Sequence, residues 1–136
     1  MASEKALCKW FKGKIEGPGV HYQRLEGTTD VPDINVCVLG VEHWLEAKEL
    51  DRFPVRPTTP VRLKHNFTLG QCIWLEKRGK AYGNAWGLIQ VGREVFLISH
   101  YDIRALMNGE LTEVAFREAA AATGRIDVIG HILDER

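Results

Sequence analysis

Apolar side chains near the start of the chain recur three or four residues apart, as they do along one face of an α-helix. Ser3 stands where an N-cap residue would begin this helix, and the Gly-Pro-Gly sequence after Glu16 would end it. The pattern predicts an amphipathic helix over residues 3–16. Its apolar positions are Ala6, Leu7, Trp10, Phe11 and Ile15.

The next apolar segments have the short length and the β-branched composition of strands. A brief extended piece over residues 20–25 comes before a cluster of turn-forming residues that ends at Pro32. INVCVL at 34–39 and EHWLEAK at 42–48 follow, separated by a glycine turn. Residues 33–48 are therefore predicted to form a β-hairpin.

An irregular segment comes after the hairpin. Three prolines within residues 50–60 exclude a regular helix interior or a central strand. From Val61 to Lys80 the spacing of the apolar residues predicts a helix with an interruption near Gly70.

Two strands and two helices complete the expected elements. The strands are NAWGLIQV at 84–91 and EVFLISH at 94–100, joined through a glycine turn. The helices span residues 101–109 and 112–124, and the alanine run at 119–122 favours the second of them. This order predicts an α/β or α+β domain built around one mixed sheet.

The composition is that of one compact domain. The chain has 136 residues, of which 45% are hydrophobic and 26% charged, so we expect a single domain over residues 1–136. No apolar run approaches the roughly 18 residues that span a membrane, and charges interrupt the N-terminal segment where a signal peptide would be apolar. We therefore expect a cytoplasmic protein without membrane contact. Three widely spaced cysteines without a CxxC pair predict buried, reduced thiols.

Charge is unevenly distributed, although the formal net charge is zero. Residues 52–81 have seven basic residues and one acidic residue, whereas the segments on either side each have a net charge of −3. Phosphate binding depends on local charge, so a polyanion can dock on this basic segment despite the neutral total. Its cationic residues are Arg52, Arg56, Arg62, Lys64, Lys77, Arg78 and Lys80.

Two carboxylates and a lysine meet in the predicted hairpin. Asp33 begins the first strand and Glu46 lies near the end of the second, so antiparallel pairing brings the two carboxylates side by side. Because side chains alternate along a strand, Lys48 shares the face of Glu46, as does Trp44. Two hard carboxylates without a histidine or thiol cluster favour Mg²⁺ or Mn²⁺ over Zn²⁺. A divalent ion beside an ammonium group suits hydrolysis of a phosphodiester.

At these positions the sequence resembles the PD-(D/E)xK nuclease superfamily. Pro32-Asp33 matches the PD element and, after twelve intervening residues, Glu46-Ala47-Lys48 matches the ExK element. Residues 67–91 are similar to the helix and following strand of many members, with Gln71 at the position of the helix glutamine.

The length, element order and spacing look most like small stand-alone members of this superfamily, including archaeal-type Holliday junction resolvases, the VRR-NUC group and phage-encoded relatives. The resemblance implies a restriction-endonuclease-like core over about residues 3–100. Residues 101–136 would form a helical extension. It further implies a homodimeric, Mg²⁺-dependent DNA endonuclease acting on branched DNA in recombination or repair, in the host cytoplasm if the protein is phage-encoded. The alternatives are a nicking, flap or repair nuclease, or a non-catalytic DNA-binding protein.

The resemblance also implies a role for each matched position. Asp33 and Glu46 would bind Mg²⁺, or Mn²⁺ in its place, helped by the backbone carbonyl of Ala47. Lys48 would orient or activate the attacking water and stabilise developing negative charge. Gln71 would position Lys48 or a phosphate.

Many relatives have a further acidic residue facing the site, and this chain offers three. Glu26 is preferred because it lies on the approach to Asp33, whereas the start of a helix already explains Glu4 through the helix dipole. Glu16 is the third candidate. Asp30 is an alternative to Asp33 as a metal ligand, although its surroundings favour a turn.

The remaining polar and aromatic residues give weaker indications. The five histidines have no metal-binding spacing, and the four tryptophans are interpreted as core residues. DNA-backbone contacts are expected from the basic segment, without base reading. The expected DNA-binding residues are Arg52, Arg56, Arg62, Lys64, Lys77 and Arg78.

Overall fold

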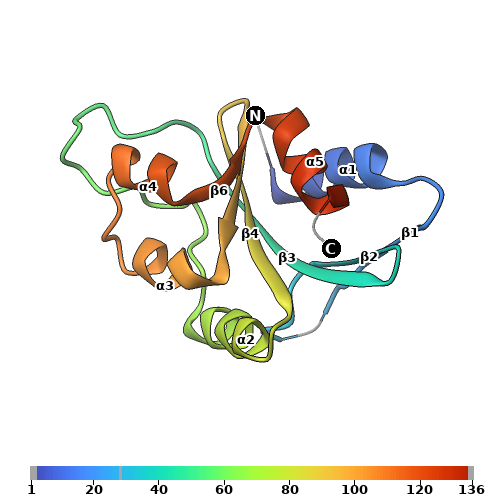
Figure 1. Cartoon of the computed structure of the whole chain (residues 1–136). Helices are drawn as coiled ribbons and strands as arrows, with labels where there is room; N and C mark the ends of the chain where they lie inside the picture. Colours follow the sequence, from blue (N-terminus) through green and yellow to red (C-terminus); the bar gives the residue numbers. More distant parts are fainter. Residues whose placement is uncertain (1–2, 28, 135–136) are drawn as a thin grey trace.

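A six-stranded mixed sheet covered by helices on both faces forms the centre of the computed structural model, which describes residues 3–27 and 29–134 (Figure 1). The α/β class predicted from the sequence is confirmed. The elements in chain order are α1 (Glu4–Ile15), β1 (Val20–Arg24), β2 (Ile34–Val38), β3 (Val41–Leu50), α2 (Leu69–Lys80), β4 (Asn84–Val91), β5 (Glu94–Ser99), α3 (His100–Met107), α4 (Glu113–Ala119), β6 (Ala120–Thr123) and α5 (Arg125–Asp134).

The strands lie across the sheet in their sequence order, β1 to β6. Neighbouring strands are antiparallel except β3 and β4, which are parallel with Glu46 opposite Gly87. A parallel pair cannot be joined by a tight turn and needs a crossover connection. Residues 51–83 provide it, and they bring the start of α2 back over β3.

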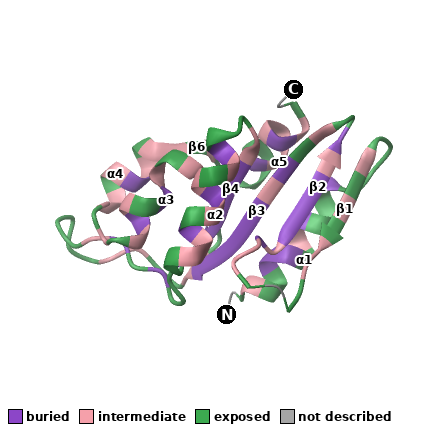
Figure 2. Cartoon of the chain, turned by 90° about the horizontal axis from the view of Figure 1, so that it is seen from below, coloured by how far each residue is buried: buried purple, intermediate pink, exposed green. Residues whose placement is uncertain are grey.

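Alternation along the central strands builds two separate cores. Leu45, Leu88 and Leu97 pack on one face of the sheet with Phe11 of α1 and Ile132 of α5. Figure 2 shows the buried stripe that runs along β2 and β3. The core on the other face comprises Ala85, Ile89, Phe96 and Ile98 of the sheet with Cys72 and Leu75 of α2, Ile103 of α3 and Phe116 of α4. The segment after residue 100 therefore closes both cores.

The predicted first helix and hairpin are confirmed. Ser3 caps α1, with its hydroxyl accepting the Ala6 N–H at 3.0 Å. In the hairpin, Val38 pairs with Val41, and the two turn residues between them, Leu39 and Gly40, adopt φ of 50° and 88°. Positive φ at both central residues matches the twist of a tight hairpin.

The helix predicted over residues 61–80 begins only at Leu69. Before it, the backbone bonds to other segments, with the Val61 N–H donating to Leu111 and the Lys64 N–H to Glu49. Leu63 and Phe67 are buried, as their apolar character requires, but they lie in a loop and not in a helix. The missed signal is the capping box at Thr68-x-x-Gln71, which fixes the helix start.

The helix predicted over residues 112–124 is also wrong in its second half. Ala120–Thr123 form β6, which pairs antiparallel with β5 and places Ala122 opposite Leu97. Sheet pairing here overrides the helix propensity of alanine. Gly124, at φ 96°, then turns the chain into α5, which lies beyond the end of the predicted helix and was not predicted.

All three cysteines are free, and burial is confirmed for Cys8 and Cys72, whereas Cys37 is only half-buried. Burial raises the pKa of Cys8 to about 12. In the part of the chain that the structure describes, no helix has the length and apolar character to cross a bilayer.

Replacing Thr68 with alanine removes both the hydroxyl that caps α2 and one half of its capping box. We expect the free energy of unfolding to fall by about 1 kcal/mol, a typical value for an N-cap. Urea unfolding of Thr68→Ala beside Thr58→Ala, an exposed loop position, measures this. Equal stability of the two variants would contradict the capping role.

Candidate functional site

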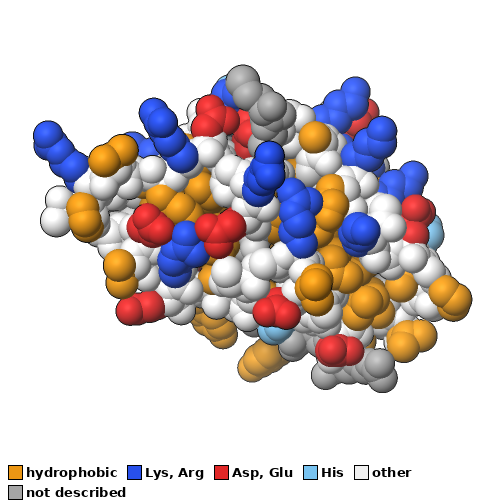
Figure 3. Space-filling model, turned by 90° about the horizontal axis from the view of Figure 1, so that it is seen from above, with side chains coloured by type: hydrophobic (Ala, Val, Ile, Leu, Met, Phe, Trp, Pro, Cys, Tyr) orange, Lys and Arg blue, Asp and Glu red, His pale blue; other side chains and the backbone are white. Residues whose placement is uncertain are grey.

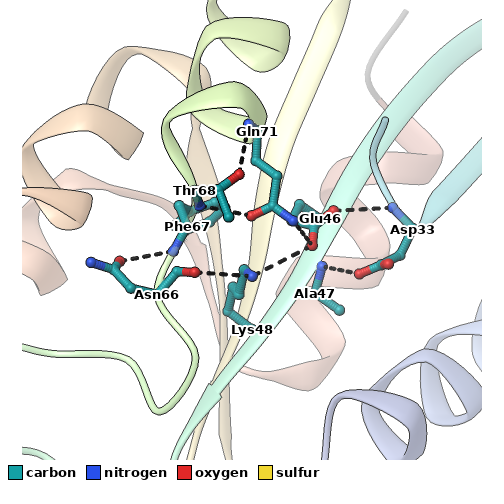
Figure 4. A network of polar contacts seen from close by, with 8 residues as sticks. All are labelled: Asp33, Glu46, Ala47, Lys48, Asn66, Phe67, Thr68 and Gln71. Atoms are coloured by element: carbon teal, nitrogen blue, oxygen red, sulfur yellow. Dashed lines mark hydrogen bonds and ion pairs between the residues drawn. The ribbon is translucent and has the colours of Figure 1, made fainter. Parts of the chain in front are cut away.

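The two predicted carboxylates lie side by side where β2 begins. The Asp33 N–H donates to Glu46 Oε1 at 3.2 Å, and the Ala47 N–H donates to Asp33 Oδ2 at the same distance (Figure 4). Ile34 pairs with Leu45, so β3 runs on beyond the start of its partner. The pair therefore occupies the fork where the two strands part.

Ala47 orients its backbone toward the same fork. The N–H and C=O groups of one strand residue point to the same neighbouring strand. Because the Ala47 N–H bonds Asp33, its carbonyl lies on the Asp33 side of β3. The three groups predicted as metal ligands, two carboxylates and one carbonyl, thus share one side of the strand.

Glu46 is almost completely buried. It is 3% exposed, and its Oε2 accepts a hydrogen bond from Gln71 Nε2 at 3.2 Å and lies 3.7 Å from Lys48 Nζ. Burial raises the pKa of Glu46 to about 8, the charge of Asp33 adds to this, and Lys48 opposes it. A divalent cation at this carboxylate pair would relieve the like-charge repulsion.

Gln71 is fixed by the start of α2. Its Oε1 accepts the Thr68 N–H at 3.0 Å in the capping box, which leaves its amide N–H₂ to reach Glu46. The structure thus brings Gln71 into the site as predicted, but it bonds Glu46 rather than Lys48. One residue both begins the helix and orients the carboxylate.

Lys48 is 4% exposed and is surrounded on three sides. Beside the Glu46 contact, its Nζ donates to the Asn66 carbonyl at 3.3 Å and lies 5.4 Å from the centre of the Phe67 ring. Asn66 is itself anchored, since its Nδ2 donates to the Met107 carbonyl at 2.8 Å. Asn66 was not predicted as a site residue, because the conformation of the loop decides its role.

Among the further acidic candidates, Glu4 is the one with an electrostatic link to the site. Burial raises the pKa of Glu4, and the charges of Lys48 and Asp33 act on it in opposite directions. Its Oε2 is buried without a hydrogen-bond partner among the described residues. Glu26 is exposed, and no described residue of the site bonds to it. The sequence favours Glu26 because it lies close to Asp33 along the chain, whereas the charges of the site act on Glu4 through the fold.

The two remaining acidic alternatives lie elsewhere. Asp30, at φ 70°, rests its carboxylate against Gly70 in the first turn of α2, where a Cβ would collide with it. Its positive φ fits the predicted turn. A carboxylate is also favourable at a helix N-terminus, which explains its contact with α2. Glu16 is the C-cap of α1, at the opposite end of that helix from Glu4.

A third acidic side chain of β3 was missed. Glu49 is 3% exposed, with one carboxylate oxygen 3.5 Å from Lys64 Nζ and the other without a partner among the described atoms. Lys64, expected to contact DNA, is thus engaged with a buried carboxylate. The burial of Glu49 could have been predicted from its position in a strand that is buried on both faces.

The other basic residues are spread over several elements. Arg52 and Arg56 are exposed in the loop after β3, Arg62 packs against Gly109, and Lys77 is exposed on α2. In Figure 3 Lys and Arg side chains project from the end of the molecule formed by this loop, but Asp, Glu and hydrophobic side chains separate them from others on that face.

The donor set fits Mg²⁺ better than a metal that needs a full protein cage. Within residues 3–27 and 29–134, no group of three or more His, Cys, Asp or Glu side chains is arranged to hold a metal ion. Mg²⁺ commonly keeps several waters and is bound through one or two carboxylates plus substrate phosphates. Asp33 and Glu46 offer that minimal set.

Comparison with known proteins adds no relationship. No family model matches the chain, and no curated protein matches it.

The raised pKa of Glu46 predicts a specific pH dependence. The carboxyl keeps its proton in the folded state up to about pH 8 but ionises near its ordinary value of 4.5 when unfolded. Folding therefore loses stability as pH rises from about 4.5 to about 8. Glu46→Gln, a neutral isostere, should become progressively more stable than the native chain over this range without metal.

Urea unfolding at several pH values with a chelator measures that difference. Glu42→Gln, at an exposed position of the same strand, is the control and should follow the native profile. A constant difference between Glu46→Gln and the native chain from pH 5 to 8 would contradict the assignment.

Proposed function

We propose that this protein is a Mg²⁺-dependent DNA endonuclease of the PD-(D/E)xK type. The observation that supports this most is that Asp33 bonds both Glu46 and Ala47, with Lys48 beside Glu46 on the same strand. Two adjacent carboxylates and one ammonium group, with Glu46 and Lys48 buried, suit metal-assisted hydrolysis of a phosphodiester.

Each residue has a role in this reaction. Bound Mg²⁺ would lower the pKa of a water and neutralise charge on the phosphate. Asp33, Glu46 and the Ala47 carbonyl would hold it, and Glu4 would bind an outer water or a second ion. Lys48, a buried ammonium group, would orient the attacking water and stabilise the charge that develops on the phosphate.

Gln71 acts through Glu46. Its bond to Oε2 leaves less freedom to the carboxylate, and the capping box holds the amide in place. Loss of this bond would let Glu46 turn toward Lys48 and close the metal site. Gln71 is therefore a positioning residue in the proposal.

The substrate class rests on the resemblance rather than on the site. Small stand-alone relatives favour branched DNA and a homodimer that cuts two strands symmetrically, which a C2 arrangement of two sites would provide. Nicking, flap or repair cleavage in phage DNA metabolism is the alternative within the same chemistry. A non-catalytic DNA-binding protein is the alternative outside it.

Cleavage of labelled DNA with Mg²⁺ tests the proposal. The native chain should cut, and Glu46→Gln should reduce the rate by at least about a hundredfold, as loss of one preorganised charge-stabilising group does. A four-way junction, a flap, a single strand and a linear duplex identify the preferred structure. Paired symmetric cuts in the junction would support the homodimeric resolvase.

Glu42→Gln again provides the matched control, because it removes one carboxylate from an exposed position of β3. It should cut at the native rate. DNA binding without cutting in either Mg²⁺ or Mn²⁺ would favour the non-catalytic alternative, and equal rates for the two glutamine variants would contradict the assigned site.

A further inference from the structure

Arg78 lies over two tryptophan rings beside the candidate site. Its guanidinium carbon is 5.0 Å from the centre of the Trp44 ring and 4.6 Å from that of Trp74, and the two rings are 5.1 Å apart. Contact with the ring faces is favourable for a guanidinium group and leaves its in-plane N–H donors available. Both tryptophans are half-buried, so the rings themselves are well anchored.

The aliphatic part of the Arg78 side chain packs closely against Gly83. The Gly83 N–H donates to the Arg78 carbonyl at 2.9 Å, and a Cβ at Gly83 would lie 2.6 Å from Arg78 Cδ. Any larger residue would displace the stem. Two aromatic rings and one glycine therefore define the position of this side chain before any ligand binds.

Arg78 has no carboxylate partner among the described residues, unlike two other arginines of the fold. Arg104 is bonded to Glu76 at 2.6 Å, and Arg117 is bonded to Glu94 at 2.8 Å. Those two guanidinium groups are neutralised within the fold. The preorganised donors of Arg78 remain available for an anion, and a phosphate matches their planar geometry.

This arginine continues the surface on which the site is built. Gln71, Trp74 and Arg78 follow at i, i+3 and i+7, so they share one face of α2. Trp44 and Glu46 share one face of β3 for the same reason of periodicity. At 1.5 Å per residue, Arg78 lies about 10 Å along the helix from Gln71, a separation that no more than about three nucleotides of a DNA strand can span.

We propose that Arg78, held by Trp44, Trp74 and Gly83, binds one backbone phosphate within about three nucleotides of the phosphate that is cut. This rests on the proposed nuclease function and deepens it, because it assigns a second phosphate subsite. Lys77 is adjacent and equally charged but exposed without such a cradle, so it contributes only diffuse attraction.

The test measures DNA binding by fluorescence anisotropy without divalent metal, so that cleavage does not interfere. Arg78→Gln should weaken binding about tenfold or more, the scale of one charge-assisted contact, while Lys77→Gln weakens it far less. Arg78→Lys keeps the charge but loses the planar arrangement of N–H donors of the guanidinium group, so it should recover only part of the affinity. Trp74→Leu leaves the guanidinium but removes one ring, and it should fall between the native chain and Arg78→Gln.

Methylphosphonate substitution, one phosphate at a time, locates the contact. Neutralising one phosphate should weaken binding to the native chain but not to Arg78→Gln, and that position should lie within about three nucleotides of the cut. Thermal unfolding of each variant separates a folding defect from a lost contact.

The two proposals fail separately. Equal affinities of Arg78→Gln and Lys77→Gln would overturn the phosphate subsite, as would identical methylphosphonate profiles for the native chain and Arg78→Gln. Neither result would contradict the proposed nuclease activity. A chain that cuts no DNA but shows the Arg78-dependent position would retain the phosphate contact and lose the nuclease. Absence of DNA binding by the native chain would overturn the subsite as well.

Discussion

Burial of charge in the central strand β3 is the constraint on which the rest of the structure depends. Glu46, Lys48 and Glu49 are 3%, 4% and 3% exposed, and a buried charge is costly unless other groups satisfy it. The partners come from different parts of the chain: Asp33 from the start of β2, Gln71 from α2, and Asn66 and Lys64 from the loop between β3 and α2. The crossover from β3 to β4 is the element that delivers most of them.

Such a cluster is a poor means of stabilising a fold. Replacing a buried ion pair with well-packed apolar residues is often neutral or stabilising, by about 1–4 kcal/mol. The like charges of Asp33 and Glu46 add repulsion, which is one reason for the raised pKa of Glu46. Polar groups arranged at an energetic disadvantage are typical of functional sites, and this argument supports chemistry at the fork independently of any resemblance.

The parts of the fold and site that sequence could predict depend on local pattern. Asp33 and Glu46 were placed together because hairpin register follows from a short turn and a period of two. The start of α2 was predictable from Thr68 and Gln71, but the apolar spacing of the preceding loop obscured it. By contrast, β6 exists because the edge of β5 accepts it, and alanines alone predict a helix. The position of Glu4 and the cradle of Arg78 likewise depend on tertiary packing.

Direct counting of bound Mn²⁺ by electron paramagnetic resonance tests the central claim, that the Asp33–Glu46 pair binds a divalent cation. Free Mn²⁺ gives a signal that binding removes, and the measurement needs no substrate. The native chain and Glu42→Gln should bind Mn²⁺, and Mg²⁺ should displace it, whereas Asp33→Asn and Glu46→Gln should lose this binding. Equal binding by all four proteins, or binding by none, would contradict it.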